Sequence, residues 1–356
     1  MFAPGRLVDA PTSGRRRRGP VPCDKGSCRR LSKRLLTRGG RMSIYEDEHE
    51  MFRATVARFV DAELIPRHDE FVAARGFTPD VWRTAGEIGL LGLAVDPRFG
   101  GGGTDDYRFQ AVAIAELARA SAAAASAFSI HFDVCAPYLT ELTDDAQRER
   151  WLPGFCTGRS VAAIAMTEPS GGSDLASLRT TATREGESWR LDGSKTFITN
   201  GRTAGIVIVA ARTTPGKGAR GISLFVVESG TEGLVQTHSL DKIGQHDADT
   251  AELFFDGLVI PAENLLGTVD RGFHQMMAML PRERLGAAIA NLAHAEHALA
   301  LTLEHVKERT AFGSAIGRFQ YNAFTLADLR TELDVGTAFV ERCIVDLAGG
   351  RLDAVT

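Results

Sequence analysis

The chain has 356 residues, enough for two or three domains with cores of their own, and its 44% hydrophobic and 24% charged residues are ordinary for a globular protein. No stretch is long and apolar enough to span a bilayer. Five scattered cysteines form no disulfide framework, and Cys23 and Cys28 lack a second Cys/His pair, so we expect a cytoplasmic protein without a metal site.

The net charge of −4 hides a basic N-terminal segment. Residues 1–41 carry twelve Lys or Arg and two Asp, a balance of +10, so the rest of the chain carries about −14. The acidic body gives no support for nucleic-acid binding. We predict that residues 1–41 are a disordered basic extension. It is either a targeting or nucleic-acid arm or sequence upstream of a true start at Met42, and we favour the second because ordered patterning begins after Met42.

Residues 42–159 are predicted to form an N-terminal helical domain. Its first helix carries Met51 on an apolar face and ends at Pro66, and Gly89 closes the second. The alanine-rich third helix implies close packing of its neighbours, and Pro153 ends the fourth. The expected helices span about 43–65, 79–88, 105–126 and 144–152.

Residues 160–270 change to a β pattern. Short β-rich runs separated by turn residues predict a middle domain that is a β-barrel or sandwich, with strands near 161–166, 189–198, 205–212, 221–228 and 251–256. The segment Gly216–Gly221 matches GxGxxG. It lies between two strands with no helix after it, so we assign it to a turn and not to a dinucleotide site.

Residues 271–356 return to helices, from Gly272 to Lys307 and from Gln320 to Leu347, each with an apolar stripe. Bundles normally have four helices, so we predict a C-terminal helical bundle with about two of its four helices present. Either other chains supply the missing partners or the sequence is truncated.

The segment Met166–Asp174 (MTEPSGGSD) follows a short apolar run. Two adjacent glycines let the main chain approach a ligand closely, and Thr167 and Ser173 offer hydroxyl groups beside them. Such a loop suits a flat, polar-edged cofactor or a phosphate, but it also fits a surface turn between strands.

This order of helical, β and helical domains, with MTEPSGGSD opening the β domain, resembles the acyl-CoA dehydrogenase family over residues 43–356. Three further segments are similar to that family: Lys195–Gly201 (KTFITNG), Asp249–Leu253 (DTAEL) with the exit loop Val259–Asn264, and Arg309–Gly313 (RTAFG) with Gln320. The resemblance implies a three-domain fold, FAD, an acyl-CoA substrate, an electron-transfer flavoprotein as acceptor, a homotetramer and a role in fatty acid metabolism.

The resemblance also assigns site residues. Ser173 is expected to contact the FAD phosphates or the CoA arm. Phe197 stands where tryptophan is common, which keeps the aromatic face and loses the indole donor. The implied flavin contacts are Met166, Thr167, Phe197 and Thr199, and, across a subunit interface, Arg309, Phe312 and Gln320.

Removing an α-proton from a thioester requires a carboxylate whose pKa is raised in a dry pocket. Glu283 stands where the long-chain and isovaleryl subset resembled here carries this base on the first helix of the C-terminal bundle. Arg284 matches the family's neighbouring arginine, and Pro281 could kink the helix. Glu283 between two arginines is also compatible with a solvated surface ion-pair cluster. His131 is left out of the site.

We therefore predict α,β-dehydrogenation of an acyl-CoA thioester to the trans-2-enoyl-CoA, with Glu283 as the base and FAD N5 as the hydride acceptor. The alternatives are a truncated, inactive relative, a flavin monooxygenase or oxidase on the same fold, and a non-enzymatic helical scaffold.

Overall fold

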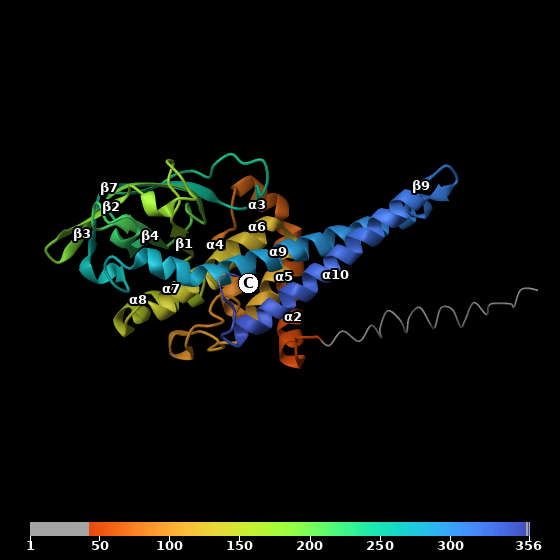
Figure 1. Ribbon diagram of the computed structural model, residues 1–356, viewed down its shortest axis with the longest axis horizontal. Helices are drawn as coiled ribbons and strands as arrows, with labels where there is room; N and C mark the ends of the chain where they lie inside the picture. Colours follow the sequence, from red (N-terminus) through yellow and green to blue (C-terminus); the bar gives the residue numbers. More distant parts are fainter. Residues whose placement is uncertain (1–42, 354, 356) are drawn as a thin grey trace, which may run out of the picture. The chain divides into compact units, whose positions relative to one another are not determined.

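The computed structural model describes residues 43–353 and 355. Its elements belong to the unit Ile44–Thr356, and the predicted extension 1–41, with Cys23 and Cys28, lies outside the described residues. Helices come first, strands follow, and two long helices end the chain (Figure 1). The predicted order of helical, β and helical parts is confirmed.

The last two short helices of the first part pack with the sheet, and most of the others surround a separate apolar core. Phe59, Trp82 and Phe128 are buried in this core, and the rings of Trp82 and Phe128 stack with centroids 4.2 Å apart. Met51, predicted on the apolar face, is instead 72% exposed. The elements are α2 (Asp47–Phe59), η1 (Val60–Leu64), η2 (Ile65–Arg67), α3 (His68–Ala74), α4 (Pro79–Glu87), η3 (Pro97–Phe99), α5 (Arg108–Ala120), α6 (Ala122–Ser129), η4 (Ile130–Cys135), α7 (Ala136–Glu141) and α8 (Asp145–Cys156).

Two helix predictions were wrong in detail. The helix expected over 105–126 is divided at Ser121, whose backbone is extended and whose hydroxyl accepts a hydrogen bond from the Ala124 N–H as the N-cap of α6. The helix expected to end at Pro153 continues through it to Cys156. Trp151 and Phe155 are buried on either side of this proline, and their packing outweighs the lost backbone hydrogen bond.

The middle part is a single bent sheet. Its strands lie in the order β6-β7-β3-β2-β4-β5-β8, and β1 pairs in parallel with β4. Among the described strands β6 and β8 are the two ends of this order, so the sheet is not the closed barrel that we considered. Strands β4 and β5 are buried on both faces, one inside the bend and one against helices, whereas β3 and β7 alternate between buried and exposed residues. The strands are β1 (Ala162–Ala165), β2 (Thr181–Glu185), β3 (Ser188–Thr199), β4 (Ile206–Arg212), β5 (Ile222–Glu228), β6 (Leu234–Gln236), β7 (Thr250–Pro261) and β8 (Leu265–Leu266).

The short 3-10 turn η5 (Leu175–Ser177) precedes β2. Between β4 and β5 the chain forms the 3-10 turn η6 (Gly218–Gly221), which confirms the turn predicted for the GxGxxG match. The turn η7 (Ala262–Asn264) follows β7.

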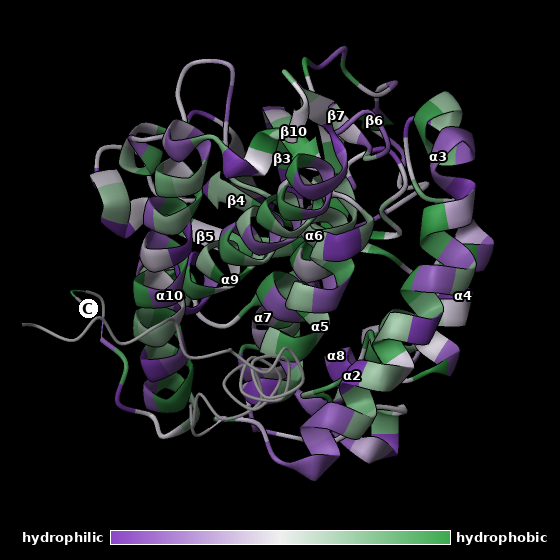
Figure 2. Ribbon diagram, turned by 90° about the vertical axis from the view of Figure 1, so that its right-hand side faces the viewer, coloured by the Kyte–Doolittle hydropathy of each residue, from purple (hydrophilic) through white to green (hydrophobic). Residues whose placement is uncertain are grey.

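The last part consists of α9 (Gly272–Glu308) and α10 (Gln320–Ala348), which run side by side (Figure 1). A hairpin of β9 (Thr310–Ala311) and β10 (Ser314–Ala315), followed by η8 (Ile316–Arg318), connects them. Helix α9 is continuous through Pro281 and packs on α5 and η4. Hydrophobic and hydrophilic residues are mixed along α10 (Figure 2), and its Leu329 is 45% exposed. Among the described helices, none has the length and apolar character to cross a membrane.

Candidate active site

Glu283 lies on α9 near its contact with η4. Its Oε1 accepts a 3.0 Å hydrogen bond from the hydroxyl of Tyr138 on α7. Burial raises the pKa of Glu283 above that of an ordinary glutamate, the Tyr138 hydrogen bond acts in the opposite direction, and the nearby Asp133 carboxylate adds to the rise. A carboxylate in this state is suited to accept a proton near neutral pH.

Arg282, which precedes Glu283, belongs to a second network. Its Nε donates a 3.0 Å hydrogen bond to Oδ1 of buried Asp133, and the Tyr107 hydroxyl donates to Oδ2 at 3.2 Å. The guanidinium carbon lies 4.9 Å from the centre of the Tyr107 ring. Arg282 therefore pairs with Asp133 and is not the partner in a surface ion-pair cluster with Glu283.

Arg284 lies on a different face of α9, because neighbouring helical residues are about 100° apart. It is exposed and lines a pocket of about 250 Å³ with Phe339 and Cys343 of α10 and with Asp353. The Glu283 carboxylate bonds instead to Tyr138, so the two predicted residues are adjacent in sequence but take different surroundings.

The segment Met166–Asp174 follows β1 and begins with a tight turn. Glu168 and Gly171 exchange two backbone hydrogen bonds of 3.2 and 3.0 Å. Met166 and Thr167 are partly exposed beside this turn, and Ser173 is exposed. The segment thus contains the predicted surface turn, and its exposed residues leave the alternative of a ligand-binding loop open.

A buried ion pair ties this loop to β3. Lys195 Nζ donates to Glu168 Oε1 at 2.9 Å and to the Met166 carbonyl at 3.1 Å, and both charged side chains are at most 4% exposed. The Thr196 N–H donates to the Thr167 carbonyl at 3.0 Å. Burial lowers the pKa of Lys195 to about 8, against the opposing effect of Glu168. The loop and the strand are therefore held as one surface.

Phe197 lies on β3 at an irregularity in its pairing with β7. Its φ of 59° is in the left-handed region, and its side chain is 68% exposed. An exposed aromatic ring in a strained backbone is typical of a ligand contact. Thr167 and Thr199 are partly exposed, and this is the surface at which the resemblance implies a flavin ring.

Arg309, Phe312 and Gln320 lie at the far end of the α9–α10 pair, distant from β1 and β3 (Figure 1). Phe312 and Gly313 both have positive φ in the two-residue turn between β9 and β10, and the Phe312 side chain is 99% exposed. Within one chain, the structure does not bring these residues to the other predicted flavin contacts.

Three family models match this chain in sequence order: the N-terminal, middle and C-terminal domains of acyl-CoA dehydrogenase, over residues 46–159, 163–258 and 270–355. A long-chain specific acyl-CoA dehydrogenase of Sus scrofa is 40% identical over 88% of this chain and 73% of its own length. An isovaleryl-CoA dehydrogenase of Oryza sativa is 32% identical over 91% of this chain and 79% of its own length.

The chain belongs to the acyl-CoA dehydrogenase family.

Solved structures agree with this membership. An acyl-CoA dehydrogenase of Geobacillus kaustophilus aligns with a TM-score of 0.85 and 39% identity, covering 87% of this chain and 81% of that one. A glutaryl-CoA dehydrogenase of Mycobacterium smegmatis in complex with FADH2 aligns with a TM-score of 0.81 and 25% identity, covering 90% and 80%.

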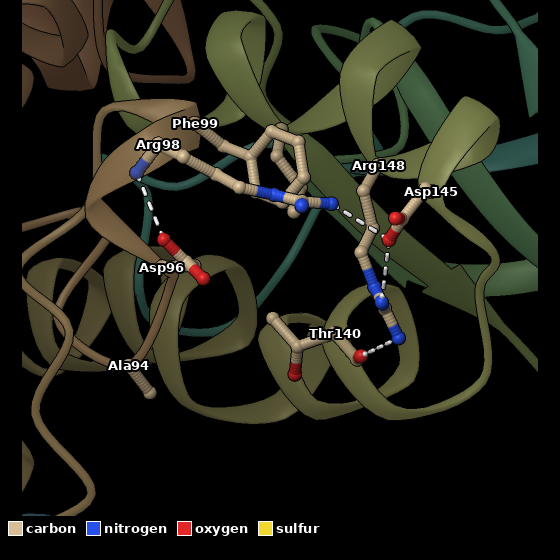
Figure 3. Close-up of a pocket in the computed structure, with 8 residues that line it drawn as sticks. Ala94, Asp96, Arg98, Phe99, Thr140, Asp145 and Arg148 are labelled. Atoms are coloured by element: carbon tan, nitrogen blue, oxygen red, sulfur yellow. Dashed lines mark hydrogen bonds and ion pairs between the residues drawn. The ribbon is translucent and has the colours of Figure 1, made fainter.

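A separate pocket of about 350 Å³ lies between η3 and helices α7 and α8 (Figure 3). Arg98 and Arg148 both pair with Asp145, and Arg148 also donates to the Thr140 carbonyl. These charges are satisfied by one another, and none of the predicted site residues lines the pocket. It is not our candidate site for the chemistry of an acyl-CoA dehydrogenase.

His131 has a structural environment. Its Nδ1 accepts a hydrogen bond from the Ala162 N–H at 3.0 Å, its Nε2 lies 3.2 Å from the Phe155 carbonyl, and burial lowers its pKa to about 3. Both nitrogens are occupied, so His131 links the helices to β1. The sequence did not indicate the roles of Tyr138 and Asp133, because their partners on α9 are more than a hundred residues away. Tyr107 was also missed, because no local pattern encodes its bond to Asp133 of η4.

Proposed function

We propose that this chain, as an acyl-CoA dehydrogenase, removes hydrogen from the α and β carbons of an acyl-CoA thioester to give the trans-2-enoyl-CoA. The observation that carries the proposal is the half-buried Glu283 carboxylate with its raised pKa, in a family whose named members act on acyl-CoA. The names of these relatives favour dehydrogenation over the monooxygenase or oxidase alternative.

Glu283 is the proposed base. It takes the α-proton of the substrate. Its raised pKa lies closer to neutral pH than that of an ordinary glutamate, which makes it a stronger base. Burial around the carboxylate limits competition from water, and the negative charge of Asp133, which is paired with Arg282, adds to the pKa rise.

A bound flavin supplies the acceptor for the hydride from the β carbon. Met166, Thr167, Phe197 and Thr199 are the residues proposed to hold its ring. Phe197 supplies an aromatic face, and the two threonine hydroxyls supply hydrogen bonds at the ring edge. The Lys195–Glu168 pair fixes the loop and the strand that carry them. We propose that the flavin is FAD, because a structural relative contains FADH2.

Two further assignments concern the substrate and the assembly. Ser173 and Arg284 are proposed to contact the substrate, Ser173 from the exposed part of the loop. Arg309, Phe312 and Gln320 are proposed to contact the FAD of a neighbouring subunit in a homotetramer. Their distance from β1 and β3 within one chain, and the complete exposure of Phe312, support contacts made between chains.

The remaining proposals concern the electron acceptor and the location. An electron-transfer flavoprotein is the proposed acceptor, and one structural relative, with a TM-score of 0.83, is described as the electron transferring flavoprotein of Acidaminococcus fermentans. We proposed a cytoplasmic protein from its cysteines, whereas the curated relatives carry mitochondrial names. Fractionation of cells that express the tagged chain decides between these locations.

The test of the function is flavin bleaching. The flavin-loaded protein should lose its visible absorbance when one of a panel of acyl-CoAs is added without oxygen. Glu283→Gln should retain FAD but reduce the bleaching rate by a factor of about 10² to 10⁴, the usual contribution of a general base. The matched control is Glu304→Gln, an exposed glutamate on the same helix, which should bleach at the wild-type rate.

Bleaching by Glu283→Gln at the wild-type rate would rule out Glu283 as the base. Purified protein without flavin absorbance would favour the scaffold or inactive relative, and steady oxygen consumption by the reduced protein would favour the oxidase or monooxygenase.

A further inference from the structure

The Glu283 carboxylate is held from one side by a buried hydroxyl. Tyr138 has no solvent exposure, and its ring belongs to the core cluster that also contains Leu139 and Trp151. Packing therefore fixes the position of the hydroxyl oxygen, which lies 3.0 Å from Glu283 Oε1. A donor on a rigid ring constrains the orientation of the carboxylate that accepts from it.

The helix that carries Glu283 is fixed as well. Arg282 pairs with Asp133 of η4 one residue before Glu283. One turn later, a Cβ atom at Gly286 would lie 2.5 Å from Asp133 Oδ2, so glycine permits the close approach of α9 to η4. These two contacts keep the Glu283 backbone within reach of the Tyr138 hydroxyl.

We propose that Tyr138 is the positioning residue of the base: its hydroxyl binds Oε1 of Glu283 and leaves Oε2 as the oxygen that receives the substrate proton. Among the described residues, the Tyr138 hydroxyl is the hydrogen-bond donor to this carboxylate. The inference rests on the proposed function, because it concerns the same base.

The proton and electron balance is simple. The α C–H bond breaks and its electron pair forms the α,β double bond, while the hydride of the β carbon goes to the flavin oxidant of the proposed reaction. The α-proton forms a new bond with Glu283 Oε2. Tyr138 keeps its own proton throughout and contributes only a hydrogen bond, which becomes weaker as the carboxylate loses its charge.

The groups around Glu283 set the expected pH dependence. Asp133 and Cys135 of η4 and Tyr138 of α7 lie near its carboxylate. On its own helix, Arg282 pairs with Asp133, and Arg284 lines the pocket toward α10. Of these, the Tyr138 hydrogen bond lowers the pKa of Glu283. Its removal must therefore raise that pKa further, so that the base becomes ionised only at higher pH.

The test compares the pH profiles of flavin reduction by acyl-CoA in single turnover. For Tyr138→Phe, the acidic limb of the rate profile should move up by about one pH unit, the size expected for a charge-assisted hydrogen bond. The high-pH plateau should fall about tenfold because the carboxylate is no longer oriented. Tyr107→Phe removes a similar buried hydroxyl bond beside Asp133 and should cause no upward move of the acidic limb.

A second variant covers the case in which Tyr138→Phe does not fold. A fluorinated tyrosine at position 138 keeps the ring and is a stronger hydrogen-bond donor, so the acidic limb should move to lower pH. If acyl-CoA reduces the flavin of the wild-type protein normally but a folded Tyr138 variant keeps the wild-type acidic limb, this inference is overturned and the proposed function stands. Failure of every acyl-CoA to reduce the wild-type flavin overturns the proposed function and this inference with it.

Discussion

His131 shows how a single buried side chain makes stability depend on pH. It is neutral in the folded chain, with a pKa lowered to about 3 by burial, whereas an unfolded histidine titrates near pH 6.5. The unfolded chain therefore binds the extra proton first as pH falls. The contribution of neutral His131 to the free energy of unfolding is complete above about pH 6.5 and is lost progressively as the pH falls from there toward 3.

We predict that wild-type protein loses about 2 kcal/mol more unfolding free energy between pH 6 and pH 4 than His131→Gln does. Urea denaturation at a series of pH values measures this difference. The exposed His297→Gln should keep the wild-type pH dependence. Equal slopes for wild type and His131→Gln would show that His131 is not the titrating group.

Among the links between elements, the Ser121 side chain connects α6 to the segment between β6 and β7. Its hydroxyl caps α6 by accepting from the Ala124 N–H and donates a 2.5 Å hydrogen bond to buried Asp247. We predict that Ser121→Ala destabilises the fold by about 1 to 3 kcal/mol, because it removes a cap and leaves a buried carboxylate without its donor. Ser129→Ala, which removes a hydroxyl bond within one helix, should cost much less in the same denaturation assay.

The Lys195–Glu168 pair is a second link between elements, because it joins the loop after β1 to β3. Lys195→Met should cost about 3 kcal/mol or more, because it leaves Glu168 buried and charged without its partner. It should also reduce the flavin content of the purified protein. Exposed Lys217, 3.4 Å from Asp270, is the matched control, and Lys217→Met should change stability by less than about 0.5 kcal/mol.

The double variant Glu168→Gln with Lys195→Met separates charge from packing. It should recover part of the stability lost by Lys195→Met, because no unpaired buried charge remains. If the double variant is less stable than Lys195→Met, the buried charge is not the cause of the loss.

At the scale of the whole molecule, the apolar stripe of α10 includes Leu329, which a single chain leaves 45% exposed. In the proposed homotetramer such residues are covered by other subunits. We predict that Leu329→Asp lowers the sedimentation coefficient of the flavin-loaded protein while each chain stays folded. Val259→Asp, at a similarly exposed position on β7, should sediment as wild type. A wild-type protein that sediments as a monomer would contradict the tetramer.

The order of the parts could be predicted because each has its own periodicity, and α9 and α10 matched their expected ends within about one residue. Strand β2 was missed because Ala182 is its one buried residue, so it shows no apolar alternation. The break at Ser121 was missed because alanine on both sides favours a continuous helix. Glu283 was found by resemblance, but Tyr138, 145 positions earlier in the chain, was not, because no local pattern encodes that contact.

Phe197 has a consequence for protein engineering. Its left-handed backbone lowers stability by about 1 kcal/mol or more, and its exposed ring buries too little apolar surface to offset that cost. Phe197→Asn should therefore raise the melting temperature of flavin-free protein while weakening flavin retention. A screen that selects thermostable variants from cofactor-depleted lysates would enrich this substitution despite its weaker flavin retention, so such screens should be run on the loaded protein.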